Sequence, residues 1–312
     1  MSISPLMSLG VKAMTASYAG LQVAGHNIAN ANVAGYSRQQ AELSTAKGQF
    51  TGVGFFGRGV DVTTITRQHN AFLTVEAASA RSLSAMDAAR LSQLRQLENV
   101  FKTGELGLGH ATSQFMNAMV DVSSRPSDLA TRQVALARAG DLAARFSEAG
   151  QALDGVQTQV TSTLRTSVAE INGLAASIAE SNIRIAALKG LGQPANVLLD
   201  ERERLISKLS VHVQVTRIEA EDGSMAIFIG GGQSLVLGTQ SATLKVLQDD
   251  VDPSRSAIGL TEGNLQRNLE ASSLGGGVGG LLRFQNQDLV LGRNLIGRLA
   301  ASVAGAVNAQ QL

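Results

Sequence analysis

A long stretch without proline dominates the middle of the chain and limits the folds that it can adopt. Residues 127–188 contain no proline and few glycines. Apolar residues recur there at seven-residue spacing, with Val168 and Ala175 at intervening positions; they are Phe146, Leu153, Val160, Leu164, Ile171, Ile178 and Ile185. Heptads of this kind are typical of helices that pack against other helices, and roughly sixty residues at 1.5 Å each form a rod about 90 Å long. The glycines that could bend or break such a helix are Gly140, Gly150, Gly155 and Gly173.

Shorter helical patterns lie on both sides of this stretch. Residues 71–103 lack glycine and proline and are rich in strong helix formers. Residues 110–124 and 197–210 predict two further helices, and residues 281–312 predict a closing one. Pro126 stands where it would occupy the first turn of the long helix.

Two regions favour β structure instead. Residues 40–67 alternate in part and contain glycine-rich turns, which predicts a β-hairpin or a long irregular excursion. Farther along, Val211, Val213 and Val215 alternate, and three short apolar runs follow up to residue 248. Four short strands separated by Gly or Asp turns predict a small antiparallel sheet. The glycines of residues 274–280 predict a flexible joint after it.

Together these patterns predict a mainly α fold with a β insertion. We expect a long coiled-coil-like helical bundle, an N-terminal axial helix and a small antiparallel β region. The expected divisions are residues 1–70 for the N-terminal axial helix with an extended or hairpin segment, 71–210 for the long-helix bundle, 211–265 for the β region, and 266–312 for the glycine-rich joint and returning helix. Helical ends around a β insertion also lead us to expect both termini in one helical layer.

The N-terminal helix, expected over residues 5–30, is apolar on two faces. One face is a heptad seam that consists of Met7, Val11, Met14, Tyr18, Leu21, Gly25 and Ile28, and the stripe beside it consists of Leu6, Leu9, Ala13, Ala16 and Gly20. A helix that is apolar on two sides needs neighbours on both. Two interpretations remain open: burial inside one domain, or burial only when copies of the chain pack together.

The composition argues against several classes of protein. The charges nearly cancel, with 26 Lys and Arg against 25 Asp and Glu, so nothing points to nucleic acid or an anionic membrane as a partner. The absence of cysteine excludes disulfides and thiol nucleophiles. The first twenty residues do not resemble a secretory signal, and no apolar stretch reaches the roughly 18 residues of a membrane span.

The motifs that could carry chemistry are weak. Gly52, Gly54 and Gly57 match the dinucleotide pattern G-x-G-x-x-G, but a β-type segment follows them instead of a helix. The four histidines are far apart and lack the spacing of helical metal ligands. Alternating charges at residues 200–204 indicate a solvated helix face or salt bridges more than an acid/base pair. We therefore predict no catalytic residue, no cofactor and no metal site.

An asparagine-rich run, GHNIANANVAGYSRQ at residues 25–39, follows the N-terminal helix. Asn and Gly tolerate left-handed backbone and favour turns, so the helix is expected to end near Ile28 or Asn30. Side-chain amides in such a segment can bond backbone groups of another chain. We add this run to the helix seam as a candidate assembly interface, which then comprises Met7, Val11, Met14, Tyr18, Leu21, Asn27, Ile28, Asn30, Asn32, Gly35 and Tyr36.

This run closely resembles the N-terminal signature of bacterial flagellar axial proteins, and its S-R-Q extension resembles the hook-associated protein 1 family. Two further segments support the resemblance: LLDERERLISKLS is similar to the family's L-L-D-x-R-D/E-x-L-L-x-x-L-S, and GGGVGGLLRFQNQDLVLGRNLIGRLA to its G-G-x-L-G-G-L-L-x-F-R stretch. The sequence departs from the family at Val33 and Ala34, where Thr-Pro is usual. Family members also continue well past residue 312, so the chain resembles a member that lacks its C-terminal part.

The resemblance implies a structural protein of the bacterial flagellum, secreted unfolded through the type III export apparatus without a cleaved signal. Its implied partners are copies of itself in a ring-like assembly, the neighbouring hook, a second junction protein and an export chaperone. On this basis we expect the N-terminal segment to stay mobile until its apolar stripes dock on neighbouring axial helices. The alternatives are another axial subunit, from the rod or the hook, and a non-enzymatic coiled-coil adaptor module.

Overall fold

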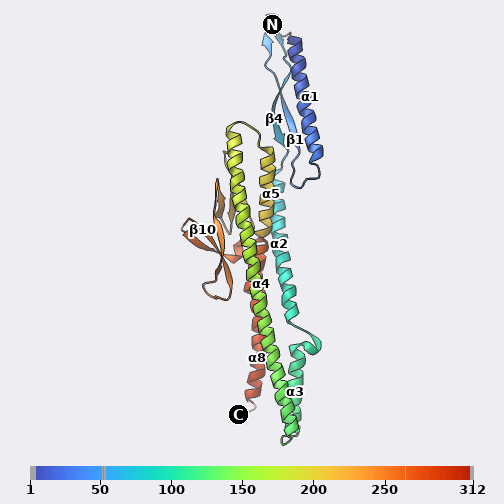
Figure 1. Ribbon diagram of the computed structural model, residues 1–312, viewed down its shortest axis with the longest axis vertical. Coiled ribbons are helices and arrows are strands. Elements are labelled where there is room, and N and C mark those ends of the chain that lie inside the picture. Colours follow the sequence, from blue (N-terminus) through green and yellow to red (C-terminus); the bar gives the residue numbers. More distant parts are fainter. Residues whose placement is uncertain (1–4, 51, 53, 264, 310–312) are drawn as a thin grey trace.

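The computed structural model describes residues 5–309 apart from residues 51, 53 and 264. The molecule is elongated, and helix α4 (Leu129–Gly190) runs along most of its length (Figure 1). This 62-residue helix continues through Gly140, Gly150, Gly155 and Gly173, so the long helix expected from the heptads is confirmed. It begins after Asp128, whose carboxylate accepts a hydrogen bond from the Ala130 N–H at 2.9 Å. The prediction that Pro126 occupies its first turn is therefore wrong.

Other helices pack around α4 at different heights. Helices α2 (Ala71–Val100), α5 (Asn196–His212) and α7 (Gly276–Arg283) pack beside its C-terminal half. Helices α3 (Leu108–Ser124) and α8 (Val290–Ala309) pack beside its N-terminal half (Figure 1). The short elements are the 3₁₀ turn Gly104–Leu106, helix α6 (Ala271–Leu274) and the π-helix Phe284–Leu289.

The N-terminal part is a helix on a hairpin. Helix α1 (Pro5–Ala29) lies along strands β1 (Gln39–Thr45) and β4 (Val60–Arg67). The two strands pair antiparallel from Gln39 opposite Arg67 to Thr45 opposite Val60, with a bulge after Glu42. Strands β2 (Gln49–Phe50) and β3 (Phe55–Phe56) form its tip. This confirms the predicted hairpin.

The second β region lies between α5 and α6 and forms two antiparallel sheets. One has the order β5-β6-β7-β8 and the other β11-β10-β9. The strands are β5 (Thr216–Glu219), β6 (Met225–Ile229), β7 (Gln233–Leu237), β8 (Gln240–Ser241), β9 (Thr243–Gln248), β10 (Ser256–Glu262) and β11 (Leu265–Leu269). The strand predicted at Val211–Val215 is wrong, because α5 continues to His212 and Val213 is buried at its end.

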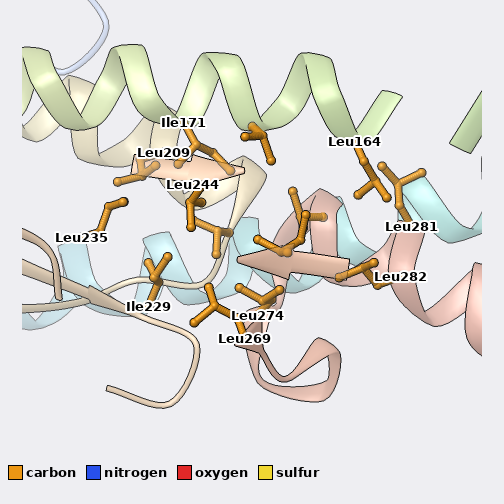
Figure 2. Close-up of a cluster of buried hydrophobic side chains, with 14 of the residues drawn as sticks. Leu164, Ile171, Leu209, Ile229, Leu235, Leu244, Leu269, Leu274, Leu281 and Leu282 are labelled. Carbon is orange, nitrogen blue, oxygen red and sulfur yellow. The ribbon is translucent and has the colours of Figure 1, made fainter. Parts of the chain in front are cut away.

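Most of the core lies between α4 and these sheets. Figure 2 shows Leu164 and Ile171 of α4 on one side and Ile229 of β6 and Leu269 of β11 on the other, with Leu244 of β9 between. The heptad residues of α4 from Leu153 to Ile185, Val168 and Ala175 included, are at most 6% exposed. A smaller second cluster joins α3 and α4 to α8 farther down; it comprises Ala111, Phe115, Leu142, Ala139, Phe146, Val303 and Val307.

The glycine run expected as a flexible joint is instead part of this core, and that prediction is wrong. Gly276, Gly279 and Gly280 are buried in α7, which packs against α2. A Cβ atom on Gly280 would lie 2.2 Å from the carbonyl oxygen of Met86 in α2. Gly280 thus serves the close backbone approach of α7 to α2, and composition alone does not distinguish this role from flexibility.

Helix α1 lies at one end of the molecule, and α8 runs toward the opposite end (Figure 1). For the part of the chain that the structure describes, the expectation that both terminal helices share one layer is therefore wrong. The N-terminal unit, which we define as α1 with β1 to β4, projects beyond the helical body.

Candidate assembly surface

Helix α1 has two opposite faces with different environments. The face toward the hairpin carries Ala16 and Val23, which are 8% and 7% exposed, with Lys12 and Ala19 half-buried beside them. Lys12 also forms an ion pair with Asp61 of β4, with its Nζ atom 2.8 Å from the carboxylate. We expected both apolar stripes of this helix to lack partners until assembly. That is wrong for Ala16 of the small-residue stripe, which is buried within the chain.

The predicted seam lies on the other face and faces away from the hairpin. Its large side chains are exposed: Met7 66%, Val11 55%, Met14 68%, Tyr18 63%, Leu21 71% and Ile28 78%. Single exposed apolar residues are ordinary, but a continuous apolar stripe along a helix marks a surface for a partner. Within the part of the chain that the structure describes, the seam is therefore not buried inside its own domain, as the first of the two interpretations expected.

The turn after α1 is built around the side chain of Asn27. Its Nδ2 donates to the Gln39 carbonyl at 2.9 Å, and its Oδ1 accepts from the Gln39 N–H at 2.8 Å. The same Oδ1 accepts from the Tyr36 hydroxyl at 2.7 Å. Because that hydroxyl has one proton, its 3.0 Å contact with His26 Nδ1 requires the imidazole to donate. Asn27 and Tyr36 thus use their polar groups to fix the start of β1.

The remaining residues of the asparagine run have separate surroundings. Asn30 Nδ2 donates to the His26 carbonyl at 2.9 Å, one turn back in α1, while Asn32 is exposed in the following turn. Gly35 has a positive φ of 85°, a conformation that favours glycine, and it lies against Arg204 of α5. Partial burial raises the pKa of the Tyr36 hydroxyl above its ordinary value, and the Asp200 carboxylate raises it further.

Replacing Asn27 with alanine is expected to speed hydrogen exchange at the Gln39 amide by about tenfold, because a partly buried N–H loses its acceptor. Mass spectrometry of the peptide that contains Gln39 measures the rate. Asn32→Ala is the matched control and should leave that rate unchanged, since the Asn32 side chain is exposed. Equal rates in both variants would contradict the role given to Asn27.

Sequence reasoning missed an aromatic cluster at the hairpin tip. Phe50, Phe55 and Phe56 are 62%, 80% and 60% exposed, and the rings of Phe50 and Phe55 lie 5.4 Å apart. The sequence signal was the Phe-Phe pair inside the glycine-rich segment, which we interpreted as a turn or loop and weighed as a nucleotide motif. Gly54 and Gly57 flank β3 in the hairpin and open no helix, so the geometry does not fit a dinucleotide fingerprint.

The charged run at residues 200–204 is packed in part, with Arg202 buried and Arg204 exposed. Arg202 is 3% exposed, and its Nη1 donates to Asn182 Oδ1 at 3.0 Å and to the Gly223 carbonyl. Glu203 pairs with Arg217 at 2.5 Å, and Arg204 pairs with Glu201. The prediction of salt bridges holds, but the solvated helix face is wrong for Arg202. No group of three or more His, Asp or Glu among the residues described could hold a metal ion.

A long helical body with a projecting helix, apolar on its free face, is typical of structural proteins that assemble through helices. The family profile described as "Flagellar hook-associated protein FlgK helical domain" matches residues 94–312. The chain belongs to this FlgK family of flagellar hook-associated proteins. The family is structural, and its match supports the prediction that the chain is not an enzyme.

Similar proteins agree with this assignment. The chain is 32% identical to Flagellar hook-associated protein 1 of Escherichia coli (strain K12) over 99% of its own length and 57% of that protein. The Bacillus subtilis (strain 168) protein of the same name is 25% identical over 80% of the chain and 48% of that protein. The structure of the flagellar hook junction protein FlgK from Burkholderia pseudomallei superposes with a TM-score of 0.70 at 30% identity, covering 76% of this chain and 43% of that one.

The chain spans a little over half the length of the enterobacterial relatives that it matches. No helix in the described ranges has both the length and the apolar character that crossing a bilayer requires.

Proposed function

We propose that the chain belongs to the junction zone between flagellar hook and filament, and that it assembles there through the exposed seam of α1. The family match and the name of the Burkholderia relative, a hook junction protein, support this role. The family match favours it over a rod or hook subunit and over an adaptor module. The proposal includes an extracellular location on the flagellum after export with a chaperone, and contacts with copies of itself, the hook and a second junction protein.

The observation that carries the assembly role is the exposed seam. Six large apolar side chains on one helix face are between 55% and 78% exposed. Burial of each is worth roughly 1.5–3 kcal/mol when it is complete, so the face gains most when several neighbours cover it. The candidate residues in the turn act differently: Asn27, Gly35 and Tyr36 shape the segment that holds α1, whereas Asn32 is free to face a neighbour.

The test uses two double variants of the full gene on the chromosome of the source bacterium. Met14→Asp with Leu21→Asp should abolish swimming, because two charges on the seam oppose its burial. Met14→Leu with Leu21→Met keeps the seam apolar and should swim normally. Both proteins should still be exported, which an immunoblot of the culture medium checks. Normal swimming by the aspartate variant would remove the proposed role of the seam.

A further inference from the structure

The N-terminal unit is joined covalently to the helical body by residues 68–70 alone, between β4 and α2. A cavity of about 630 Å³ opens at this junction, with Ile65, Arg67, Asn196 and Arg202 among its lining residues, so apolar side chains do not fill it. The direction in which α1 projects must therefore depend on the few specific contacts at the base of the hairpin.

Those contacts come from one face of α5. Asn196, Asp200 and Arg204 are four residues apart, a spacing that places side chains on the same side of a helix. Asn196 Nδ2 donates to the Ile65 carbonyl of β4 at 2.7 Å. The Cβ and Cγ atoms of Arg204 lie beside Gly35 in the turn after α1.

Asp200 binds both chain segments that meet at the hairpin base. Its Oδ2 accepts a hydrogen bond from the Ser37 N–H at 3.2 Å, just before β1. Its Oδ1 lies 2.6 Å from Arg67 Nε at the end of β4, an ion pair that lacks the alignment of a hydrogen bond. The two side chains are only 12% and 10% exposed. Water screens their attraction less than it screens a surface pair.

Ser37 and Arg67 belong to the two chain segments that meet at the hairpin base, and their positions are offset by two residues in the strand register. The Arg38 carbonyl accepts from the Gln68 N–H at 2.8 Å, and Gln39 is the partner of Arg67 in the strand register. One carboxylate on α5 therefore holds the two strands at the point where the hairpin meets the body. This contact also joins two segments that the sequence presented separately: the asparagine-rich run and the LLDERERL segment.

We propose that Asp200 is a positioning residue that fixes the angle between the N-terminal unit and the helical body, with Arg67 and Ser37 as its partners. Without its charge, the unit pivots about residues 68–70 while α1 and the hairpin stay folded on each other. The inference concerns this chain alone and does not depend on the proposed function.

The test measures a distance across the junction. The chain has no cysteine, so spin labels can be placed at will. Ser17→Cys on α1 and Ala176→Cys on α4 are both exposed and form the cross-junction pair. Glu42→Cys with Ser17→Cys reports on the N-terminal unit, and Lys208→Cys with Ala176→Cys reports on the body. Double electron–electron resonance gives the distance distribution of each pair.

With Asp200 present, the cross-junction pair should give one narrow peak. Asp200→Asn keeps the size of the side chain, and in this variant the distance distribution of the cross-junction pair should become broad. Arg67→Gln should have the same effect. Both internal pairs should stay narrow. The matched control is Glu180→Gln, which removes an exposed carboxylate paired with Arg184 on α4 and should change none of the three. A narrow cross-junction peak in Asp200→Asn and Arg67→Gln, or equal broadening of an internal pair, would overturn the proposal.

Discussion

Replacing Gly280 with alanine should destabilise the protein by about 3 kcal/mol, the upper range for forcing extra atoms into a packed core. The added Cβ would lie 2.2 Å from the Met86 carbonyl oxygen and 3.1 Å from its Cα. The obstacle is the backbone of α2, which cannot rotate away as a side chain can. Helices α2 and α7 would have to separate. Urea unfolding followed by circular dichroism measures the change.

Gly279→Ala is the matched control, one residue away in the same helix. Its Cβ would meet the Leu274 carbonyl carbon at 3.6 Å and the Met86 sulfur at 4.0 Å, which are ordinary contacts. Alanine is the better helix former by about 1 kcal/mol, so this variant should be neutral or slightly more stable. If the two variants unfold at the same urea concentration, the close approach of α7 to α2 is not what selects glycine at position 280.

Asn182→Ala should lower the free energy of unfolding by about 3–5 kcal/mol, since it leaves several buried polar groups, the charged Arg202 among them, without one of their hydrogen-bond partners. Asn182 is fully buried and links α4 to the four-stranded sheet. Its Nδ2 donates to the Met225 carbonyl at 2.9 Å and the Gly238 carbonyl at 2.7 Å. Its Oδ1 accepts from the Met225 N–H and from Arg202, both at 3.0 Å.

Asn172→Ala is the comparison for this variant. Asn172 makes a similar pair of bonds to the other sheet, donating to the Leu244 carbonyl at 2.9 Å and accepting from its N–H at 2.8 Å. The site is partly exposed and holds no charged partner, so water can replace the amide. We expect a loss of about 1–2 kcal/mol. A cost for Asn182→Ala no greater than this, measured by the same urea titration, would contradict the central role of the Asn182 network.

The elements that could be predicted from the sequence are those whose residue pattern is compatible with a single type of secondary structure. A heptad series without proline can form only a long helix, and α4 is that helix. The hairpin at residues 39–67 was predictable because alternation and glycine turns occur together. Strand β11 was not, since its residues are mostly exposed and show no alternation.

The failures share a cause, which is that one residue type serves two structural purposes. Glycine permits flexibility and also close approach, and Gly280 serves the second. Charged residues coat surfaces and also form buried networks, and Arg202 is nine-tenths buried while its neighbour Arg204 is exposed. In α1, the small Ala16 packs inward while the larger Met14 and Leu21 face outward, an order that hydrophobicity alone would reverse.

The unbroken course of α4 has a mechanical consequence. Its backbone hydrogen bonds form continuous rows along the axis, and both apolar clusters are attached to this one helix. A torque applied to the C-terminal end of α4, near the hairpin, is therefore transmitted along one continuous helix to its N-terminal end, which packs against α3.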